Sequence, residues 1–148
     1  MDSSGEIVTA YLASFATGNP DAVAACVTDD FVNEHLSELG SGCEGRDEYR
    51  RRLPGFLSTF AGASYTIVTL AEIATPDAGD VVVRYRFAAT YEDTPIDVPG
   101  VMWFDVVDGL IARRTDLWDS LTFLRQTGTS PSPSADATDD AERAHRRP

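Results

Sequence analysis

Apolar residues recur along the chain with two different periods, and the period changes near the middle of the sequence. In the first part they lie three or four positions apart, as Val8, Leu12 and Phe15 do, which predicts an amphipathic helix. In the second part they alternate with polar residues, as in the segment 81–91. A period of two is typical of a half-buried strand. The pattern therefore predicts helices first and strands afterwards.

Capping residues indicate where the first two helices begin and end. Ser3 and Glu6 have the spacing of a capping box, so we expect the first helix to start directly after Ser3. Gly18 suits the left-handed conformation that closes a helix. Asn19 followed by Pro20 predicts a new, short helix with Asn19 as its N-cap.

A third helix is predicted over residues 46–60, because apolar residues from Tyr49 to Phe60 fall on one helical face. Pro54 lies inside this segment and is expected to kink the helix or to divide it into two pieces. Between the second and third helices, residues 31–35 are compatible with a short strand. The glycine-rich residues 36–45 that follow predict a loop.

The second half of the sequence contains four long strand-like segments, at residues 65–73, 81–91, 101–107 and 110–118. Residues 92–100 are interpreted as a connection, Asp108-Gly109 as a hairpin turn, and residues 121–124 as a closing apolar segment. Helices grouped before antiparallel strands indicate an α+β fold. We expect a curved, cone-shaped antiparallel sheet that wraps around the N-terminal helices and encloses a pocket.

The C-terminal segment differs from the rest of the chain. Residues 127–148 lack large apolar side chains and are rich in Pro, Ser, Asp and Ala. Such a segment cannot bury enough surface to offset the entropy that it would lose on ordering. We therefore expect one folded domain over residues 1–126 and a disordered tail over residues 127–148.

The net charge of the chain limits the classes of partner that it is expected to bind. Among 148 residues there are 24 Asp and Glu and 12 Lys and Arg, so the formal net charge is −12 at pH 7. A surface of this sign repels phosphate groups, and neither nucleic acid nor an anionic membrane is expected as a partner. The first residues lack the basic segment of a secretory signal, and no apolar run reaches the length of a membrane span. A cytoplasmic location is therefore expected.

The cysteines do not indicate a disulfide framework or a metal centre. Cys26 and Cys43 are the only two in the sequence, and the residues around them do not have the spacing of metal ligands. No metal site is predicted, and we expect a protein that works without a cofactor.

Asp116 is the strongest candidate for a catalytic residue. With a period of two, it shares one strand face with Arg114 and Trp118. If this face lines the pocket, a partly buried carboxylate beside an arginine suits a general base. On the segment 81–91 we expect the arginine face to point inward, so that Arg84 orients Asp116 or holds an oxyanion. The alternative for Asp116 is a purely structural salt bridge with Arg84 or Arg114.

Further side chains are candidates to assist Asp116. His35 or its neighbour Glu34 could supply a second proton-transfer group, although alternation turns one of the two toward water. Tyr11 donates a hydrogen bond from the first helix in the catalytic interpretation and packs in the core in the alternative one. Other residues are expected to bind the ligand or to wall the pocket: Phe56, Phe60, Met102, Trp103, Phe104, Arg86, Arg114 and Trp118.

Three sequence segments together resemble one superfamily. They are YLASFATGNPDAVAACVTDDFV in the first two predicted helices, GRDEYRRRL at the start of the third, and VMWFDVVDGLIARRTDLWD in the last two strands. They are similar to the nuclear-transport-factor-2-like superfamily, and most closely to its SnoaL-like branch of small polyketide cyclases, over about residues 5–125. The resemblance implies the cone-shaped fold. It does not fix an activity, because the superfamily includes isomerases, epoxide hydrolases, dehydratases, ester cyclases and noncatalytic binding modules.

Matching residues one by one connects this sequence to three members of the superfamily. Arg84 and Asp116 match the arginine and the last-strand aspartate of limonene epoxide hydrolase, whose remaining acidic position holds arginine here. Tyr11 and His35 match the tyrosine and base positions of ketosteroid isomerase, and Met102 stands at its oxyanion-binding position. SnoaL-like ester cyclases use one acid-base aspartate on the last strand, which Asp116 matches. The resemblance thus implies an acid-base role for Asp116.

Two functions of different classes follow from the sequence. The first is a cofactor-independent enzyme that isomerises, cyclises, dehydrates or hydrolyses a small hydrophobic molecule, with Asp116 as base. The second is a noncatalytic module that binds a hydrophobic metabolite or a protein partner. In either case we expect a homodimer, because an inward arginine face leaves an apolar patch on the outer face of the sheet. This patch would consist of Val81, Val83, Tyr85 and Phe87.

Overall fold

The computed structural model describes residues 2–74 and 79–128, which form four α-helices, a 3-10 turn and six strands. The helical elements are α1 (Ser4–Ser14), the 3-10 turn η1 (Phe15–Thr17), α2 (Pro20–Ala24), α3 (Arg46–Thr59) and α4 (Ser120–Thr127). The strands are β1 (Val27–His35), β2 (Cys43–Glu44), β3 (Ala61–Ala74), β4 (Gly79–Tyr91), β5 (Thr94–Val107) and β6 (Leu110–Trp118).

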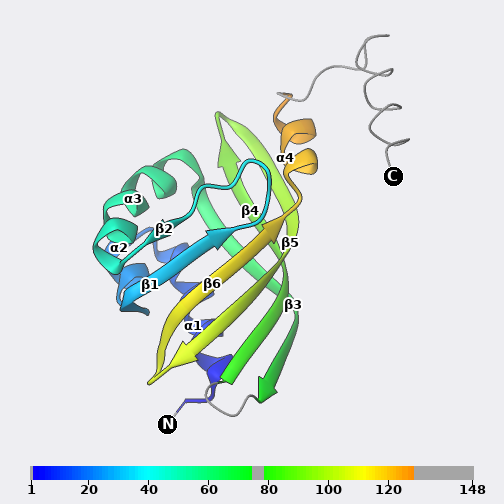
Figure 1. Ribbon diagram of the computed structural model, residues 1–148. Coiled ribbons are helices and arrows are strands. Elements are labelled where there is room, and N and C mark those ends of the chain that lie inside the picture. Colours follow the sequence, from blue (N-terminus) through cyan, green and yellow to red (C-terminus); the bar gives the residue numbers. More distant parts are fainter. Residues whose placement is uncertain (1, 75–78, 129–148) are drawn as a thin grey trace.

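The strands form one curved sheet that is not closed into a barrel, with α1 to α3 on its concave side (Figure 1). The strand order is β2-β1-β6-β5-β4-β3. Neighbouring strands pair antiparallel except β1 and β6, which pair in parallel. The predicted α+β cone is therefore confirmed, with a mixed sheet in place of a fully antiparallel one. The parallel pair matters for function because it sets His35 opposite Asp116.

The predicted helix caps are present. The Ser3 side chain accepts a hydrogen bond from the Glu6 backbone N–H at 3.1 Å, and the Asn19 side chain accepts one from Asp21 at 2.9 Å. These bonds satisfy N–H groups that have no partner inside the helix. The helix α3 is continuous from Arg46 to Thr59, so Pro54 does not divide it.

Two strands are longer than the sequence pattern predicts. The strand β1 begins at Val27, because it pairs with β6 from its first residue. The strand β5 begins at Thr94, so most of the predicted connection 92–100 belongs to the sheet. The turn before it consists of Glu92 and Asp93, with φ of 47° and 66°. This turn contains no glycine, the residue by which a two-residue hairpin turn is most readily predicted from sequence. The predicted Asp108-Gly109 hairpin is present, with φ of 51° and 79°.

The orientation predicted for β4 is wrong. Val81, Val83 and Tyr85 are buried in the main core, whereas Arg84 and Arg86 lie on the exposed face. Because the side-chain period of a strand is two, choosing the wrong face displaces every residue to the other side of the sheet. The apolar face packs against the helices because it buries hydrophobic surface without placing two guanidinium groups in the core.

The closing segment 121–124 lies in α4, whose N-cap Asp119 accepts a hydrogen bond from the Thr122 N–H at 3.0 Å. This helix extends to Thr127, so the predicted domain boundary at residue 126 falls in its last turn. The rest of the predicted tail, residues 129–148, lies outside the described residues. No helix in segments 2–74 and 79–128 has the length and apolar character of a membrane span.

Candidate active site

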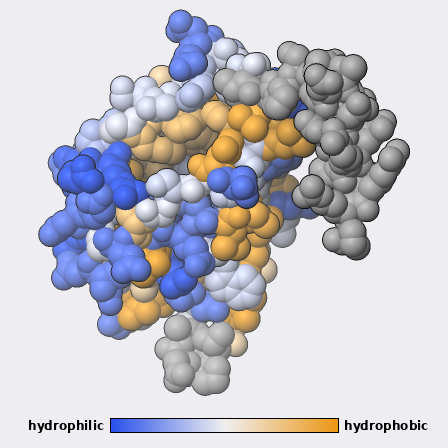
Figure 2. Space-filling view, turned by 45° about the horizontal axis from the view of Figure 1, so that its top comes forward, coloured by the Kyte–Doolittle hydropathy of each residue, from blue (hydrophilic) through white to orange (hydrophobic). Residues whose placement is uncertain are grey.

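A cavity of about 550 Å³ opens between the concave face of the sheet and α3. Its rim contains exposed residues from the β1–β2 loop and from α3, including Leu39, Ser41, Arg52 and Thr59. Figure 2 turns the end of the molecule that carries α4 toward the viewer and shows hydrophobic surface gathered there beside hydrophilic surface. The volume is that of a site for a small organic molecule.

Aromatic side chains line most of this cavity. They come from the helical elements and from strands β3, β4 and β6: Phe15, Tyr49, Phe56, Phe60, Tyr65, Tyr85, Phe87, Tyr91, Trp118 and Phe123. Several of them contact one another with tilted or edge-to-face rings, as Phe60 does with Phe87 and with Phe123. Such a wall favours a ligand with flat, apolar rings.

A buried carboxylate faces the cavity from β6. Asp116 is 2% exposed, and its two oxygens have different partners. Oδ1 accepts a hydrogen bond from the Tyr85 hydroxyl at 2.6 Å, and Oδ2 accepts one from Arg114 Nη2 at 2.9 Å. Burial and then the neighbouring carboxylate raise the pKa of Tyr85 far above its ordinary value, so this phenol remains a donor. The carboxylate is thereby held in one orientation.

Two tyrosines contact the buried guanidinium of Arg114, and a third tyrosine bonds to one of them. Its Nη1 donates to Tyr11 Oη at 2.9 Å and its Nη2 donates to Tyr65 Oη at 3.2 Å. The Tyr11 and Tyr49 hydroxyls form a further hydrogen bond of 2.5 Å. The guanidinium carbon also lies 5.9 Å from the Tyr11 ring centroid and 5.7 Å from that of Tyr65, distances of cation–π contacts. Hydrogen bonds at both Nη atoms and aromatic faces thus replace most of the water that the cation loses on burial, while Nε has no hydrogen-bond partner in the described part of the chain.

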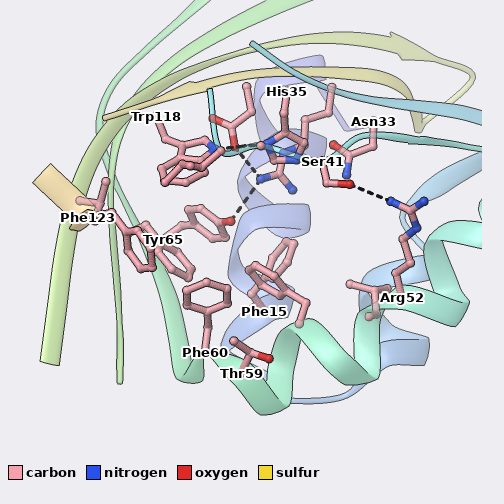
Figure 3. Close-up of a pocket in the computed structure, with 18 of the residues that line it drawn as sticks. Phe15, Asn33, His35, Ser41, Arg52, Thr59, Phe60, Tyr65, Trp118 and Phe123 are labelled. Atoms are coloured by element: carbon pink, nitrogen blue, oxygen red, sulfur yellow. Dashed lines mark hydrogen bonds and ion pairs between the residues drawn. The ribbon is translucent and has the colours of Figure 1, made fainter. Parts of the chain in front are cut away.

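His35 lies beside Asp116 and also lines the cavity (Figure 3). Its Nδ1 is 4.0 Å from Asp116 Oδ2 and accepts a hydrogen bond of 3.3 Å from Trp118 Nε1. Burial, and then the charge of Arg114, lower the pKa of His35 from 6.5 to about 4, although Asp116 acts in the opposite direction. The imidazole is therefore neutral at pH 7. Because Nδ1 is an acceptor, the proton of the neutral ring is on Nε2.

The loop after β1 fixes the position of His35. The Leu36 N–H donates to the Asp116 carbonyl at 2.8 Å, and the Ser37 hydroxyl donates to the Trp118 carbonyl at 2.6 Å. A Cβ added at Gly40 would lie 2.3 Å from the His35 Cβ, so only Gly lets the loop pack this closely. These contacts tie the parallel pair β1 and β6 together at the end where the two candidate proton-transfer groups meet.

The structure brings six of the thirteen predicted site residues to the cavity. The cavity-lining members of that set are His35, Phe56, Phe60, Arg114, Asp116 and Trp118. They were selected by helical or strand period, which places side chains on a face without giving their distances. Their roles remain predictions.

The other predicted site residues lie elsewhere, and their assignments are corrected here. Arg84 and Arg86 are exposed on the outer face, where Arg86 pairs with Asp97 at 2.8 Å. Glu34 also points away from the cavity and pairs with Arg113 at 2.9 Å. Arg84 and Arg86 follow the wrong choice of strand face, whereas Glu34 is the member of the Glu34–His35 pair that alternation turns toward water.

Four further predictions of position are corrected. Met102 and Phe104 are fully buried in the main core and do not line the cavity. Trp103 is exposed on the opposite face of the same strand and donates to Asp80 Oδ2 at 3.1 Å. Tyr11 is buried in the main core, as in the alternative interpretation of the sequence, and it contacts Arg114 and does not line the cavity.

Sequence reasoning missed the residues that orient Asp116 and one polar residue of the cavity. Tyr85 was assigned to the outer face, although the apolar character of Val81 and Val83 on its own face was a signal for the core. Tyr49 and Tyr65 were not singled out, because a tyrosine in an amphipathic pattern looks like any other core aromatic. Asn33 shares the inward face of β1 with His35. Assigning His35 to the inward face would therefore have predicted that Asn33 points inward as well.

The site has the parts of an acid-base centre: a fixed carboxylate, a neutral imidazole and an apolar wall. Within the described part of the chain, no group of three or more His, Cys, Asp or Glu is arranged to hold a metal ion. Acid-base chemistry by side chains needs a base within reach of a C–H or O–H group and a donor for the charge that develops.

Solved structures of several bacterial proteins share this fold. A Catenulispora acidiphila protein with a ketosteroid isomerase-like fold, solved with trimethylamine, has a TM-score of 0.73 and 20% identity, over 85% of this chain and 95% of that one. A protein from Silicibacter sp. described as a candidate polyketide cyclase has a TM-score of 0.65 and 23% identity, over 82% and 92%. A limonene epoxide hydrolase-like epoxide hydrolase from M. tuberculosis has a TM-score of 0.68 and 22% identity, over 88% and 96%.

At these identities the solved structures show a common fold and no common activity. Comparison with the curated proteins gives no match. The family model of the SnoaL-like domain, in contrast, matches residues 8–114, which include every strand up to the middle of β6. The chain belongs to the SnoaL-like domain family, within the nuclear-transport-factor-2-like superfamily.

Proposed function

We propose that this protein is a cofactor-independent acid-base enzyme that acts on a small hydrophobic molecule in the cavity. The observation that carries this proposal is the pairing of Asp116 with a neutral His35 on one aromatic wall. Isomerisation and cyclisation are the reactions that the pair suits best, because both begin with removal of a proton from carbon next to a carbonyl group.

In the proposed first step, an Asp116 carboxylate oxygen takes a proton from the carbon acid. The C–H bond breaks and an O–H bond forms on Asp116, while the electron pair of the C–H bond becomes a C=C bond and the C=O π pair moves onto the substrate carbonyl oxygen. The Nε2–H of neutral His35 is suited to donate a hydrogen bond to this oxygen, as a neutral imidazole does without transferring its proton. Asp116 then returns the proton to another carbon of the substrate. In a cyclisation, the carbanion instead attacks a second carbonyl carbon, the C=O π bond breaks as the C–C bond forms, and the resulting alkoxide takes the proton from Asp116.

Tyr85 and Arg114 act as positioning residues in this proposal. Both donate to Asp116, one to each oxygen, and each oxygen retains a lone pair. Their bonds hold the carboxylate toward the cavity, which reduces the reorganisation needed when the reaction starts.

The family supports this class of function without fixing the reaction. SnoaL-like folds include cyclases, isomerases and epoxide hydrolases. The carboxylate is the group that these chemistries have in common in the present cavity. A substrate panel should therefore include enones, polyketide-type esters and epoxides.

The direct test is Asp116→Asn on that panel. We expect turnover to fall by about 100-fold or more, the usual contribution of a positioned base. The substitution also leaves Arg114 without its anion, so rates are to be normalised to folded protein measured by circular dichroism. Asp97→Asn is the matched control, because Asp97 is an exposed carboxylate that pairs with Arg86 on the outer face.

Full turnover by the Asp116→Asn variant would show that Asp116 is not the base. Tight binding without turnover across the whole panel would instead favour the second reading of this fold, a noncatalytic module that holds a hydrophobic metabolite.

A further inference from the structure

Asn33 is a polar residue on a mostly apolar wall, and nothing in the proposed reaction uses it. It lies on β1 between Phe31 and His35, with all three side chains directed toward the interior. Asn33 is only 9% exposed and lines the cavity. Its carbonyl oxygen Oδ1 is fully buried and has no hydrogen-bond partner among residues 2–74 and 79–128.

An unpaired buried carbonyl is unfavourable, because the oxygen has lost its water and gained no donor. Such groups are few in native proteins, and each has a cause, such as a bound ligand, an ordered water, a catalytic role or strain. A leucine of similar size would fill the same position on this strand at no such cost. The presence of an amide there is therefore better explained by what enters the cavity than by the packing of the fold.

The cavity is divided into a polar side and an aromatic side. Figure 3 shows Asn33, Ser41 and Arg52 on one side and Phe60 and Phe123 on the other, with His35 and Trp118 along the wall between them. A ligand that fills both sides needs an apolar body and one polar group near Asn33.

Both cations near Asn33 are paired with acidic side chains, so neither is free to select an anionic ligand. Arg52 donates to Glu48 Oε1 at 2.9 Å and to the Gly42 carbonyl at 2.8 Å. Arg114, the cross-strand neighbour of Asn33, pairs with Asp116, but its Nε is also buried and has no hydrogen-bond partner among residues 2–74 and 79–128. The acceptor left over on this side is Asn33 Oδ1, and it requires a donor.

The donor that fits is uncharged. Arg114 places positive charge close to this side of the cavity, and its effect on His35 shows that a further cation is disfavoured there. A carboxylic acid would lose its proton at neutral pH and would offer no donor. An alcohol or phenol hydroxyl keeps its proton and is neutral.

We propose that Asn33 anchors the ligand by accepting a hydrogen bond from a neutral hydroxyl group on an otherwise apolar, ring-containing molecule. The inference deepens the proposed function, because it names the class of substrate that the same cavity would bind. It rests on the proposed function only in taking this cavity as the substrate site. Asn33 is a binding and specificity residue in this account, and it takes no proton.

Binding of two matched probes tests the inference. 2-Naphthol and 2-methoxynaphthalene have the same ring system, and only the naphthol carries an O–H donor. We expect the unmodified protein to prefer 2-naphthol by about tenfold, the affinity ratio for one well-made hydrogen bond. Asn33→Leu should reduce this ratio to about one. Phe123→Leu, on the aromatic side, should weaken both probes together and leave the ratio unchanged. Binding is read by quenching of the probe fluorescence.

A hydroxyl preference that survives in the Asn33→Leu variant would overturn the inference. Equal binding of the two probes by the unmodified protein, or no binding of either, would overturn it as well. Because no turnover is involved, an inactive panel with an intact hydroxyl preference would count against the proposed function alone. Turnover without a hydroxyl preference would count against this inference alone.

Stability without any ligand gives a second readout. Replacing an unpaired buried amide by an apolar side chain should raise the melting temperature, as at sites where function is kept at the expense of stability. A lower melting temperature in both Asn33→Leu and Asn33→Ala would show that Asn33 supports the fold, and would contradict a ligand-binding role.

Discussion

Each oxygen of Asp116 has one donor of its own, so single substitutions can separate orientation from chemistry. Alternation along the last strand was enough to place Asp116, Arg114 and Trp118 on one face, and the structure has them there. The sequence could not show that Tyr85 completes the arrangement, because its partner is 31 positions away and on another strand. Distances of this kind depend on register, which no local pattern records.

Tyr85→Phe should weaken both stability and activity. The variant removes the donor to Asp116 Oδ1 and leaves that oxygen buried without it. We expect the free energy of unfolding to fall by about 1.5–3 kcal/mol, the range for a hydrogen bond to a charged group. Urea denaturation measures this change. Tyr91→Phe is the matched control in the same cavity and should cost less than about 0.5 kcal/mol. Equal effects of the two variants would contradict the positioning role.

His35 gives the protein a specific dependence on pH. Its pKa is lowered from 6.5 to about 4 by burial first and by Arg114 second. Between these values the unfolded chain binds a proton that the folded protein does not, so stability falls as the pH falls through this window. The contribution of His35 is at most about 3 kcal/mol.

The matching experiment compares unfolding free energies at pH 7 and pH 4.5. His35→Gln should lose less stability between these pH values than the unmodified protein, because glutamine does not titrate. The same loss in both proteins would show that other groups cause the acid sensitivity.

At the level of single elements, the caps and the long alternating segments were predictable and the choice of strand face was not. Ser3 and Asn19 cap as expected, because a cap depends on residues two or three positions away. For β4, both faces carried a plausible pattern, and Arg84 was placed inward to serve a presumed site. The apolar face of a strand beside amphipathic helices is the safer choice for the core.

The close contact between Gly100 on β5 and Tyr85 on β4 predicts that a methyl group added at Gly100 lowers stability and turnover. A Cβ at Gly100 would lie 2.4 Å from the Tyr85 hydroxyl oxygen, so Gly100→Ala must displace the ring that holds Asp116. We expect a loss of about 1–3 kcal/mol in stability, as for an overpacked core, together with lower turnover.

Gly55→Ala is the control for that experiment. Nothing lies within 4 Å of the added Cβ, and Gly55 is exposed inside α3. The variant should gain about 0.5–1 kcal/mol, because alanine favours the helix over the unfolded chain. A neutral Gly100→Ala variant would show that Tyr85 can shift without consequence.

At the scale of the whole molecule, the order of elements predicted the fold class but not the full pairing of the sheet. Helices before strands gave the α+β arrangement, and the SnoaL-like segments gave the cone. The parallel pairing of β1 with β6 joins segments at opposite ends of the domain, so only tertiary packing decides it. This pairing is what brings His35 to Asp116.

The reversed face of β4 also changes the basis of the predicted dimer. The outer face of the sheet now presents Val101, Trp103 and Leu117, which are 42%, 43% and 52% exposed. Val101 and Leu117 are paired in register, so they form part of one apolar surface. We propose that two copies of the chain pair through this face.

Light scattering at micromolar concentration tests the dimer. The unmodified protein should scatter as twice 16.0 kDa, and Trp103→Arg should return it to the monomer mass. A monomer of the unmodified protein at that concentration would contradict the proposal.

The central claim is that Asp116 removes a proton from carbon in an aromatic cavity, and hydrogen–deuterium exchange measures this step without knowledge of the natural substrate. 2-Tetralone in D₂O, followed by proton NMR, has two fused rings and acidic C–H groups beside its carbonyl. The unmodified protein and the Asp97→Asn control should accelerate loss of these proton signals over buffer, and Asp116→Asn should exchange at the buffer rate. Equal acceleration by folded Asp116→Asn, or none by the unmodified protein, would contradict the account.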